Sequence, residues 1–395
     1  MTPSVKHAQQ TRRAEPAAPR AVPAAPARRP GEAARIGIDV HGLAELRTGI
    51  TTYVANLVDA LGRVAPDESV ALYLHTPPEY ALPFETVVVP RTRAWTSFRL
   101  PLHFALHGAP RVMLYPAHAL PVYSPARNVV TIHDLAFELF PDHFPAQARR
   151  RWKWLTRHSV PRADHLVAVS AATRDDLVRV MGVPEERITV VHHGYDAAHF
   201  RPSPDASVAE VRARYGLHRP YVMAVGTLQS RKNHVSLIRA LKLLRDGGTD
   251  VDLVVCGTDG WLFEQASRLV GELGLKEHVR FLGYVPHDDL PPLYTGAVAG
   301  ALVSLYEGFG LPVLESLGCG TPMLVSNVSS LPEVGGDAVL TVDPLDVEAI
   351  AHSLRTLICD SEVRSELARR TPGHLKRFSW ERTARAMHTL LNQIA

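Results

Sequence analysis

The sequence predicts an α/β protein with two doubly wound, Rossmann-like domains that face one another across a cleft. Its 395 residues are enough for two separate cores. From residue 35 onward, short apolar runs rich in β-branched residues alternate with amphipathic stretches of helical length, which is typical of a parallel sheet covered on both faces. The alternation breaks at a proline-rich segment between Arg201 and Pro220 and then begins again, which indicates a second domain.

Composition and charge disfavour several classes of protein. Lysine and arginine (43 residues) exceed aspartate and glutamate (40) by three, so the net charge gives no reason to expect a nucleic-acid partner. The cysteines, Cys256, Cys319 and Cys359, are far apart, so neither a disulfide framework nor a zinc site is predicted. Because no apolar run is long enough for a membrane span or a secretory signal, we expect a cytoplasmic protein.

Residues 1–34 are dominated by Ala, Pro and Arg, a composition too poor in large apolar groups to offset the entropy of ordering. We therefore expect a disordered tail. A twin-arginine export signal at Arg12 and Arg13 is a weaker interpretation, because no apolar segment follows the two arginines.

The first domain is predicted over residues 35–205. It begins with a β-branched strand, which is followed by a helix at 51–61, and later strands recur at intervals that leave room for helices. The predicted strands of this domain are 36–40, 70–74, 86–89, 112–115, 129–133, 166–169 and 188–191.

The second domain is predicted over residues 206–377, and residues 378–395 are predicted to form a C-terminal helix that can cross back to the first domain. In open α/β sheets, ligands bind at the carboxyl ends of the strands, so two facing domains predict a cleft for two substrates. The predicted strands are 221–226, 251–256, 279–282, 299–304, 323–326 and 338–342.

The most informative segment is residues 307–322, EGFGLPVLESLGCGTP, directly after a predicted strand. Its glycines permit a tight turn close to a ligand, and Pro312 is typical of the first position of a helix. Unpaired amides at that helix N-terminus are predicted to bind phosphate. Glu307 and Glu315 flank the turn, and their carboxylates can accept hydrogen bonds from sugar and ribose hydroxyls. The alternative is a glycine loop with two solvated surface glutamates.

These motifs resemble the signature of retaining glycosyltransferase family 4 (glycosyl transferases group 1), and the likeness covers about residues 36–390. The resemblance implies the GT-B fold, in which two Rossmann-like domains face across a cleft. It also implies that Glu307 contacts the donor sugar and Glu315 the ribose, while the backbone amides of Phe309, Gly310 and Leu311 face the sugar and phosphate.

A second element, residues 225–234 (VGTLQSRKNH), places two adjacent cations after a strand and the glycine turn at Gly226. Cations beside a helix N-terminus strengthen a diphosphate site. The resemblance implies that Arg231 and Lys232 bind the donor diphosphate, although Thr227 stands where some members have arginine. By itself, such a pair is more typical of a solvated helix start.

His133 and Asp134 follow a predicted strand of the first domain and are expected at the edge of the cleft. A lone histidine here is usually structural or merely exposed. The resemblance implies that His133 lies beside the donor sugar and the acceptor, with Asp134 orienting its ring or backbone. It also implies that Gly49 approaches the phosphate from the first domain, and that Val285 belongs to a segment that reads the base through backbone groups.

Two further patterns concern partners and metals. Residues 149–158 combine cations with two tryptophans, which fits an anionic membrane surface or a lipid-linked acceptor, or else a solvated helix whose tryptophans pack on the domain. The pairs Asp175-Asp176 and Asp288-Asp289 are predicted to lie at helix starts rather than in a metal-binding DxD motif, so no catalytic metal is expected.

The resemblance thus implies a retaining, nucleotide-sugar-dependent hexosyltransferase, and we expect it to act on a glycan or lipid-linked glycan in surface-polysaccharide synthesis. The segments GTLxxRKN and LPEV resemble bacterial mannosyl- and related hexosyltransferases, so GDP-mannose is the first candidate donor and a UDP-hexose the second. No cofactor is expected beyond this donor substrate. The alternatives are a sugar-nucleotide epimerase on the same scaffold and an inactive GT-B scaffold protein. A dehydrogenase is disfavoured because no strand is followed by GxGxxG.

Overall fold

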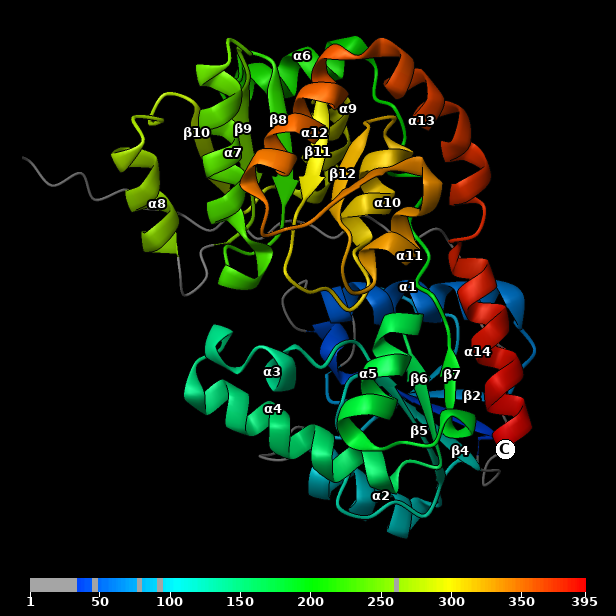
Figure 1. The fold of residues 1–395 in the computed structure, drawn as a ribbon. Coiled ribbons are helices and arrows are strands. Elements are labelled where there is room, and N and C mark those ends of the chain that lie inside the picture. Colours follow the sequence, from blue (N-terminus) through cyan, green and yellow to red (C-terminus); the bar gives the residue numbers. More distant parts are fainter. Residues whose placement is uncertain (1–33, 45–48, 77–79, 91–94, 259–262) are drawn as a thin grey trace, which may run out of the picture.

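The computed structural model describes residues 34–44, 49–76, 80–90, 95–258 and 263–395. Figure 1 shows two α/β lobes stacked one above the other, with the C-terminal helix running down the side of the lower lobe. In this described part of the chain, each lobe is built on one parallel sheet. The predicted disordered tail lies outside the described residues, apart from Ala34.

The first sheet has the strand order β3-β2-β1-β4-β5-β6-β7 in the described residues, and each neighbouring pair is parallel. The order reverses on either side of β1, which is the doubly wound arrangement that the sequence predicted. The strands are β1 (Ile36–Asp39), β2 (Val70–Leu74), β3 (Glu85–Val88), β4 (Val112–Tyr115), β5 (Arg127–Ile132), β6 (His165–Ala168) and β7 (Ile188–Val190).

The second sheet has the order β10-β9-β8-β11-β12-β13 and is also parallel throughout its described strands. The strand predicted at 338–342 begins later, at Leu340, because Gly336–Ala338 form a 3₁₀ turn in which Gly336 has a φ of 54°. The strands are β8 (Tyr221–Val225), β9 (Asp252–Cys256), β10 (Val279–Gly283), β11 (Ala299–Leu302), β12 (Met323–Ser326) and β13 (Leu340–Val342).

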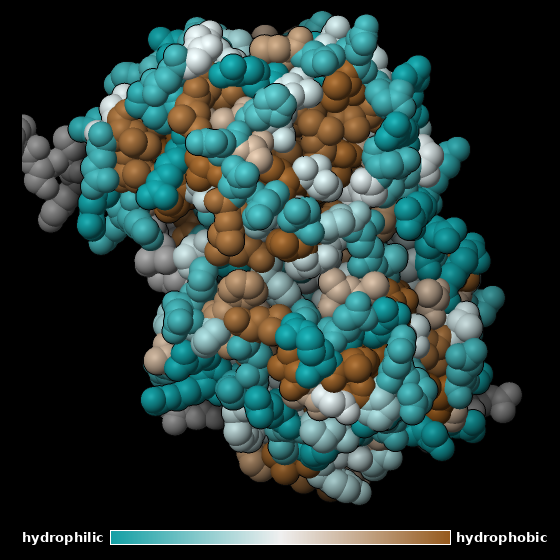
Figure 2. Space-filling model, in the orientation of Figure 1, coloured by the Kyte–Doolittle hydropathy of each residue, from teal (hydrophilic) through white to brown (hydrophobic). Residues whose placement is uncertain are grey.

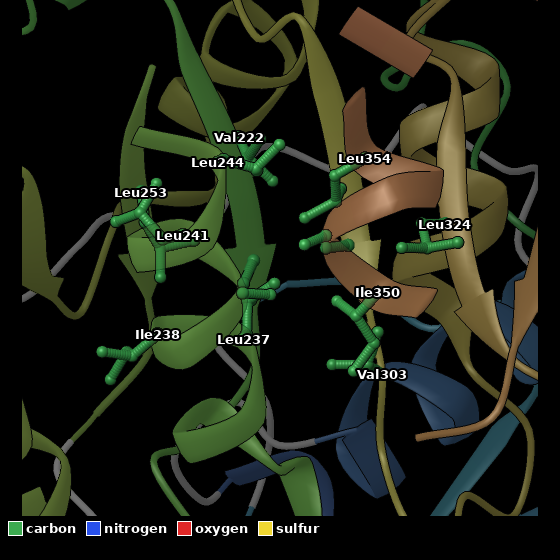
Figure 3. Close-up of a cluster of buried hydrophobic side chains, with 14 of the residues drawn as sticks. Val222, Leu237, Ile238, Leu241, Leu244, Leu253, Val303, Leu324, Ile350 and Leu354 are labelled. Atoms are coloured by element: carbon green, nitrogen blue, oxygen red, sulfur yellow. The ribbon is translucent and has the colours of Figure 1, made fainter. Parts of the chain in front are cut away.

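Helices cover both sheets, and their apolar faces form the cores. Figure 3 shows Leu237 and Leu241 of α7 beside Ile350 and Leu354 of α12, packed with side chains of the second sheet. The helices are α1 (Gly49–Val64), α2 (Leu100–His107), α3 (Ala136–Leu139), α4 (Ala146–Ser159), α5 (Ala171–Met181), α6 (Asp205–Arg214), α7 (His234–Asp246), α8 (Phe263–Glu272), α9 (Leu290–Thr295), α10 (Leu311–Gly318), α11 (Leu331–Gly335), α12 (Val347–Cys359), α13 (Ser361–Leu375) and α14 (Trp380–Ile394).

The last helix, α14, belongs to the core of the first lobe although it follows the second lobe in sequence. Trp380 and Met387 are buried in the same cluster as Leu57 of α1, and Figure 1 shows α14 beside α1. Ser379 caps the helix by accepting a hydrogen bond from the Arg382 amide. We propose domain boundaries near residues 205 and 377, with α14 fastening the second domain to the first.

Two expectations about surface helices need correction. Asp175 and Asp176 lie inside α5 rather than at its start, and the buried Asp176 accepts a hydrogen bond from Tyr306. In α4, Trp152 packs against the first core as expected, but Trp154 is 58% exposed and stacks on His158. In the described part of the chain, no helix is long and apolar enough to span a membrane.

Candidate active site

The carboxyl ends of β8 and β11 point toward the first domain, as their arrowheads in Figure 1 show. The turn after β11, residues 304–310, is the segment of the second domain that carries Glu307, and we call it the donor turn. Gly310 has a φ of 108°, a conformation that favours glycine, and it precedes the first residue of α10. Ser330 fixes the turn by donating to the carbonyls of Glu307 (3.0 Å) and Phe309 (2.7 Å). Ser330 therefore ties the donor turn to the segment that follows β12.

Glu307 is buried and ion-paired with both cations that the sequence analysis singled out. Its Oε1 accepts from Lys232 Nζ at 2.6 Å and from Ser304 Oγ at 2.6 Å, and its Oε2 accepts from Arg231 Nη1 at 3.0 Å. All three charged side chains are at most 14% exposed. The alternative interpretations, a solvated surface glutamate and a solvated pair of cations at a helix start, are both wrong.

The charges of this cluster stabilise one another. Burial acts to raise the pKa of Glu307, but the charges of Lys232 and Arg231, together with the Ser304 hydrogen bond, lower it to about 2. Burial lowers the pKa of Lys232, against the opposing effect of the Glu307 carboxylate. At neutral pH the site therefore holds an ionised carboxylate between cations.

Glycines at the ends of the neighbouring strands β8 and β9 allow close packing beside this cluster. Gly226 follows β8 with a φ of 148°, and a Cβ there would lie 3.1 Å from Lys232 Cε. Gly257 follows β9, and a Cβ there would lie 2.0 Å from the Gly226 carbonyl oxygen. Val285 lies beyond β10 and is buried in a small apolar cluster with Tyr294. Glycine is therefore required after β8 and β9, where the chain approaches its neighbours closely.

Glu315 lies apart from the ion cluster, in the second turn of α10. The half-buried side chain accepts a hydrogen bond from Tyr294 Oη at 3.2 Å, and burial raises its pKa to about 7. Leu311 is the first residue of α10 and Phe309 is buried in the turn before it. The solvated-surface interpretation therefore fails for Glu315 as well.

On the first-domain side, His133 follows β5 and is held in one tautomer. Its Nε2 donates to the carbonyl of Pro116 at 2.7 Å, so Nδ1 carries the free lone pair. Burial lowers the pKa of the ring, which keeps it neutral. Within the described residues, the hydrogen bond of Asp134 is made to the backbone and not to the ring: its Oδ1 accepts from the Ala136 amide at 3.0 Å, at the start of α3.

The first and second domains touch directly at these residues. A Cβ on Gly308 would lie 1.8 Å from the His133 carbonyl oxygen, so this glycine permits the contact. Tyr53 of α1 packs edge-on against His133 with ring centroids 5.0 Å apart, which brings the N-terminal part of α1, with Gly49 at its start, to the same side of the first domain. Thr48 lies outside the described residues.

Sequence reasoning missed several side chains that hold this site together, because none belongs to a charged pair. Ser304 and Ser330 donate hydrogen bonds to Glu307. The ring centroid of His193 lies 5.5 Å from that of His133 and 4.7 Å from that of Phe309. Within the described residues neither ring nitrogen of His193 has a hydrogen-bond partner. Ser304, the first residue of the donor turn, was the available signal, whereas Ser330 lies beyond β12 in the sequence.

Comparisons with known proteins agree with this arrangement. The model of the family Glycosyl transferases group 1 matches residues 209–374, and the model of Glycosyltransferase Family 4 matches residues 47–199. The chain is 36% identical over 296 residues to O-antigen chain mannosyltransferase B of Escherichia coli, covering 74% of each chain. The chain belongs to this family of glycosyltransferases.

Other relatives and solved structures are similar over different extents. A D-inositol 3-phosphate glycosyltransferase of Salinispora tropica is 39% identical over 57% of this chain and 50% of its own length. Sucrose-phosphate synthase from Thermosynechococcus elongatus superposes with a TM-score of 0.73 at 21% identity, over 91% of this chain and 98% of the other. Anabaena HepE in complex with UDP and glucose superposes with a TM-score of 0.72 at 17% identity, over 91% and 100%.

These findings confirm the predicted family, the GT-B fold and the glycosyltransferase class. The solved structures share too little sequence identity with this chain to show more than its fold. The role of each site residue therefore stays a prediction. The same holds for the expected absence of a catalytic metal.

Proposed function

We propose that this glycosyltransferase moves a hexose from a nucleoside diphosphate sugar to a glycan or lipid-linked glycan in surface-polysaccharide synthesis, with retention of configuration at the anomeric carbon. The observation that carries the proposal is the buried Glu307 between Arg231 and Lys232, in contact range of the His133 loop. The interface between the two domains therefore brings together groups that can bind a diphosphate, a sugar and an acceptor. We call this interface the seam.

The diphosphate would bind by replacing Glu307 as the partner of the two cations. A nucleoside diphosphate offers more negative charge and more acceptor oxygens than one carboxylate, so Arg231 and Lys232 can transfer their hydrogen bonds to it. The N-terminal amides of α10 lie beside the same turn and favour an anion. As the sugar leaves, negative charge accumulates on the diphosphate, and these donors stabilise it.

Release of Glu307 from its cations leaves two carboxylate oxygens that can accept hydrogen bonds from hydroxyls of the transferred sugar. On the opposite side of the seam, the free Nδ1 lone pair of His133 can accept a hydrogen bond from a sugar or acceptor hydroxyl. Glu315 is positioned one turn into α10, where we expect the ribose. Phe309, Gly310 and Leu311 contribute backbone groups between the two glutamates.

Mannose is the first candidate for the transferred sugar and GDP-mannose for the donor. Two relatives, from Escherichia coli and Salmonella typhimurium, are named O-antigen chain mannosyltransferases, and the latter is 26% identical over 67% of this chain. A UDP-hexose is the second candidate, since Anabaena HepE is described in complex with UDP-glucose. No metal is required in this proposal, because Arg231 and Lys232 supply the positive charge.

The proposal is tested with purified full-length protein against GDP-mannose, UDP-hexoses and their nucleotides. A ligand that binds only the native state raises the melting temperature. We expect one nucleotide to raise it, with or without EDTA, and its sugar conjugate to be consumed when a glycan acceptor is added. A donor that is epimerised without transfer would favour the epimerase, and binding without turnover would favour the inactive scaffold.

We also propose that the first domain rests on an anionic membrane surface that carries the acceptor. Hydrogen bonds join three segments of the first domain that have exposed apolar side chains. The Val122 amide donates to the Ser97 carbonyl at 3.3 Å, and Arg162, just after α4, donates to the Val122 carbonyl. Figure 2 shows hydrophobic residues at the lower end of the molecule, where α2 lies in Figure 1. The exposed side chains, which we call the lower patch, are Phe98, Leu102, Leu106, Val122, Tyr123 and Trp154.

Helix α4, which carries Trp154 of the lower patch, is rich in arginine and lysine, and this combination favours anionic lipid. Phe98→Ser with Leu106→Ser should weaken co-sedimentation with vesicles of anionic phospholipid and leave transfer to a water-soluble acceptor unchanged. The matched control is Leu345→Ser, which removes a 75% exposed leucine of the second domain. Equal vesicle binding by the double variant and the Leu345→Ser control would contradict this part of the proposal. Binding of the wild type to neutral vesicles alone would contradict it as well.

A further inference from the structure

The hydroxyl of Tyr306 joins the donor turn to two separate elements of the first domain. Tyr306 directly precedes Glu307 and is 5% exposed. Its hydroxyl donates to Asp176 Oδ2 of α5 at 2.7 Å and accepts from the Leu135 amide at 3.3 Å. Leu135 is two residues after His133. One buried hydroxyl therefore bonds both the α5 helix and the loop that carries His133.

The neighbouring groups of the second domain dock on the same helix. The Gly308 carbonyl accepts from Ser170 Oγ, the N-cap of α5, at 2.7 Å and from Thr173 Oγ1 at 3.3 Å. Glu333 of α11 accepts from the Ala171 amide at 2.9 Å, at the N-terminus of α5, where a carboxylate is favoured. The first turns of α5 thus receive three contacts from the second domain.

These contacts are costly to separate because the groups are buried. Asp176 is buried and accepts hydrogen bonds from Tyr306 and Arg179. A hydrogen bond to a carboxylate is stronger than one between neutral groups, and a buried polar group that loses its partner pays its full desolvation penalty. The Tyr306–Asp176 bond is therefore well suited to fix one position of the donor turn against the first domain.

We propose that Tyr306 and Asp176 are a positioning pair that sets Glu307 against His133 for sugar transfer. This proposal rests on the proposed function, because it assigns the two domains to donor and acceptor. Neither residue needs to touch the substrate. Their effect is on the alignment of the reacting groups, and a small misplacement of such groups lowers the rate strongly without weakening the binding of either substrate.

The experiment removes the hydroxyl but keeps the ring. Tyr306→Phe retains the packing against Phe140, whose ring centroid lies 5.5 Å away. Tyr215→Phe is the matched control, because Tyr215 donates to Asp289 at the same 2.7 Å but entirely within the second domain. We expect Tyr306→Phe to lower kcat about tenfold to 100-fold and to raise the share of donor lost to hydrolysis. The donor KM and the nucleotide Kd should stay within about twofold.

A double-mutant cycle with Asp176→Asn tests whether the two residues act as a pair, and the double variant should be no slower than the slower single variant. Equal losses of kcat in Tyr306→Phe and Tyr215→Phe, or a loss confined to nucleotide binding, would overturn the positioning role. Amide hydrogen exchange gives a readout that needs no turnover. Tyr306→Phe should raise exchange in both α5 and the donor turn, and unchanged exchange there would overturn the pairing even if the transferase proposal itself fails.

Discussion

The two domains meet at the seam with opposite chemistry. On the second-domain side, a single ionised carboxylate, Glu307, lies between two cations, Arg231 and Lys232. On the first-domain side, His133 and His193 lie among stacked rings, and burial lowers the pKa of both, so they are neutral. This difference supports the proposed division of labour, in which the second domain would bind the charged diphosphate and the first would bind uncharged hydroxyls.

The largest expected effect comes from removing a cation from the charged side. Lys232→Ala should lower sugar transfer about 10²–10³-fold, the range found when one preorganised donor to developing negative charge is lost. Steady-state kinetics would measure this, with Lys242→Ala as the control, since Lys242 forms an exposed pair with Asp246 on α7. If Lys232→Ala retained nearly full turnover, the charged side would have no role in departure of the nucleotide.

A smaller effect is expected from forcing the two sides apart. Gly308→Ala places a methyl group where the His133 carbonyl oxygen lies 1.8 Å away, so the domains must shift. We expect a loss of about 1–3 kcal/mol in the free energy of unfolding, as for other overpacked sites, together with slower transfer. Gly373→Ala in α13 is the control, because nothing lies within 4 Å of its added Cβ. Equal stability of the two variants in urea would show that the seam is not closed in solution.

The smallest effect is expected in the pH dependence of stability, through the buried neutral histidines on the first-domain side of the seam. The pKa of His118 is lowered to about 4 by burial, and those of His133 and His193 are lowered by the same cause. Below pH 6.5 the unfolded chain binds more protons on these rings than the folded protein does, so stability should fall as the pH falls. For His118 the slope is at most about 1.4 kcal/mol per pH unit between pH 6.5 and about 4. Above pH 6.5 both states are neutral and the effect vanishes.

Glu315 acts in the opposite direction in this window, because burial raises its pKa to about 7 and the folded state then binds the extra proton. The test therefore compares the wild type with His193→Phe in urea denaturation between pH 4.5 and 6.5. The variant should lose stability less steeply as the pH falls. Parallel curves would mean that His193 is charged, or partnered, in the folded protein.

Much of the fold could be predicted because its strands are continuous apolar runs. The strands at Val70–Leu74 and Met323–Ser326 have the predicted bounds, since each run ends at polar residues. The late start of β13 was missed because the turn at Gly336 depends on packing against His374 rather than on local sequence. The helix placement of Asp176 was also missed, because a buried aspartate inside a helix is explained only by its distant partner Tyr306.

The candidate site was predicted residue by residue but not as an arrangement. Glu307, Lys232 and His133 were recognised from three separate motifs, and the sequence contains no sign that Glu307 would be the counter-ion of Lys232, 75 residues away. Tyr306 looked like a spacer before the glutamate, since its role depends on a partner 130 residues away in the other domain. Such pairings arise from the meeting of two domains, and local patterns do not record them.

The central claim is that Glu307 is a resident counter-ion that the donor diphosphate displaces. Isothermal titration of GDP and UDP into wild type, Glu307→Gln and Lys232→Ala tests it most directly, with exposed Glu277→Gln as a control. Glu307→Gln should bind the preferred nucleotide several-fold more tightly than the wild type, because two buried cations then lack a partner, and Lys232→Ala should bind it more weakly. Weaker binding by Glu307→Gln, or equal binding by all the variants, would contradict the claim.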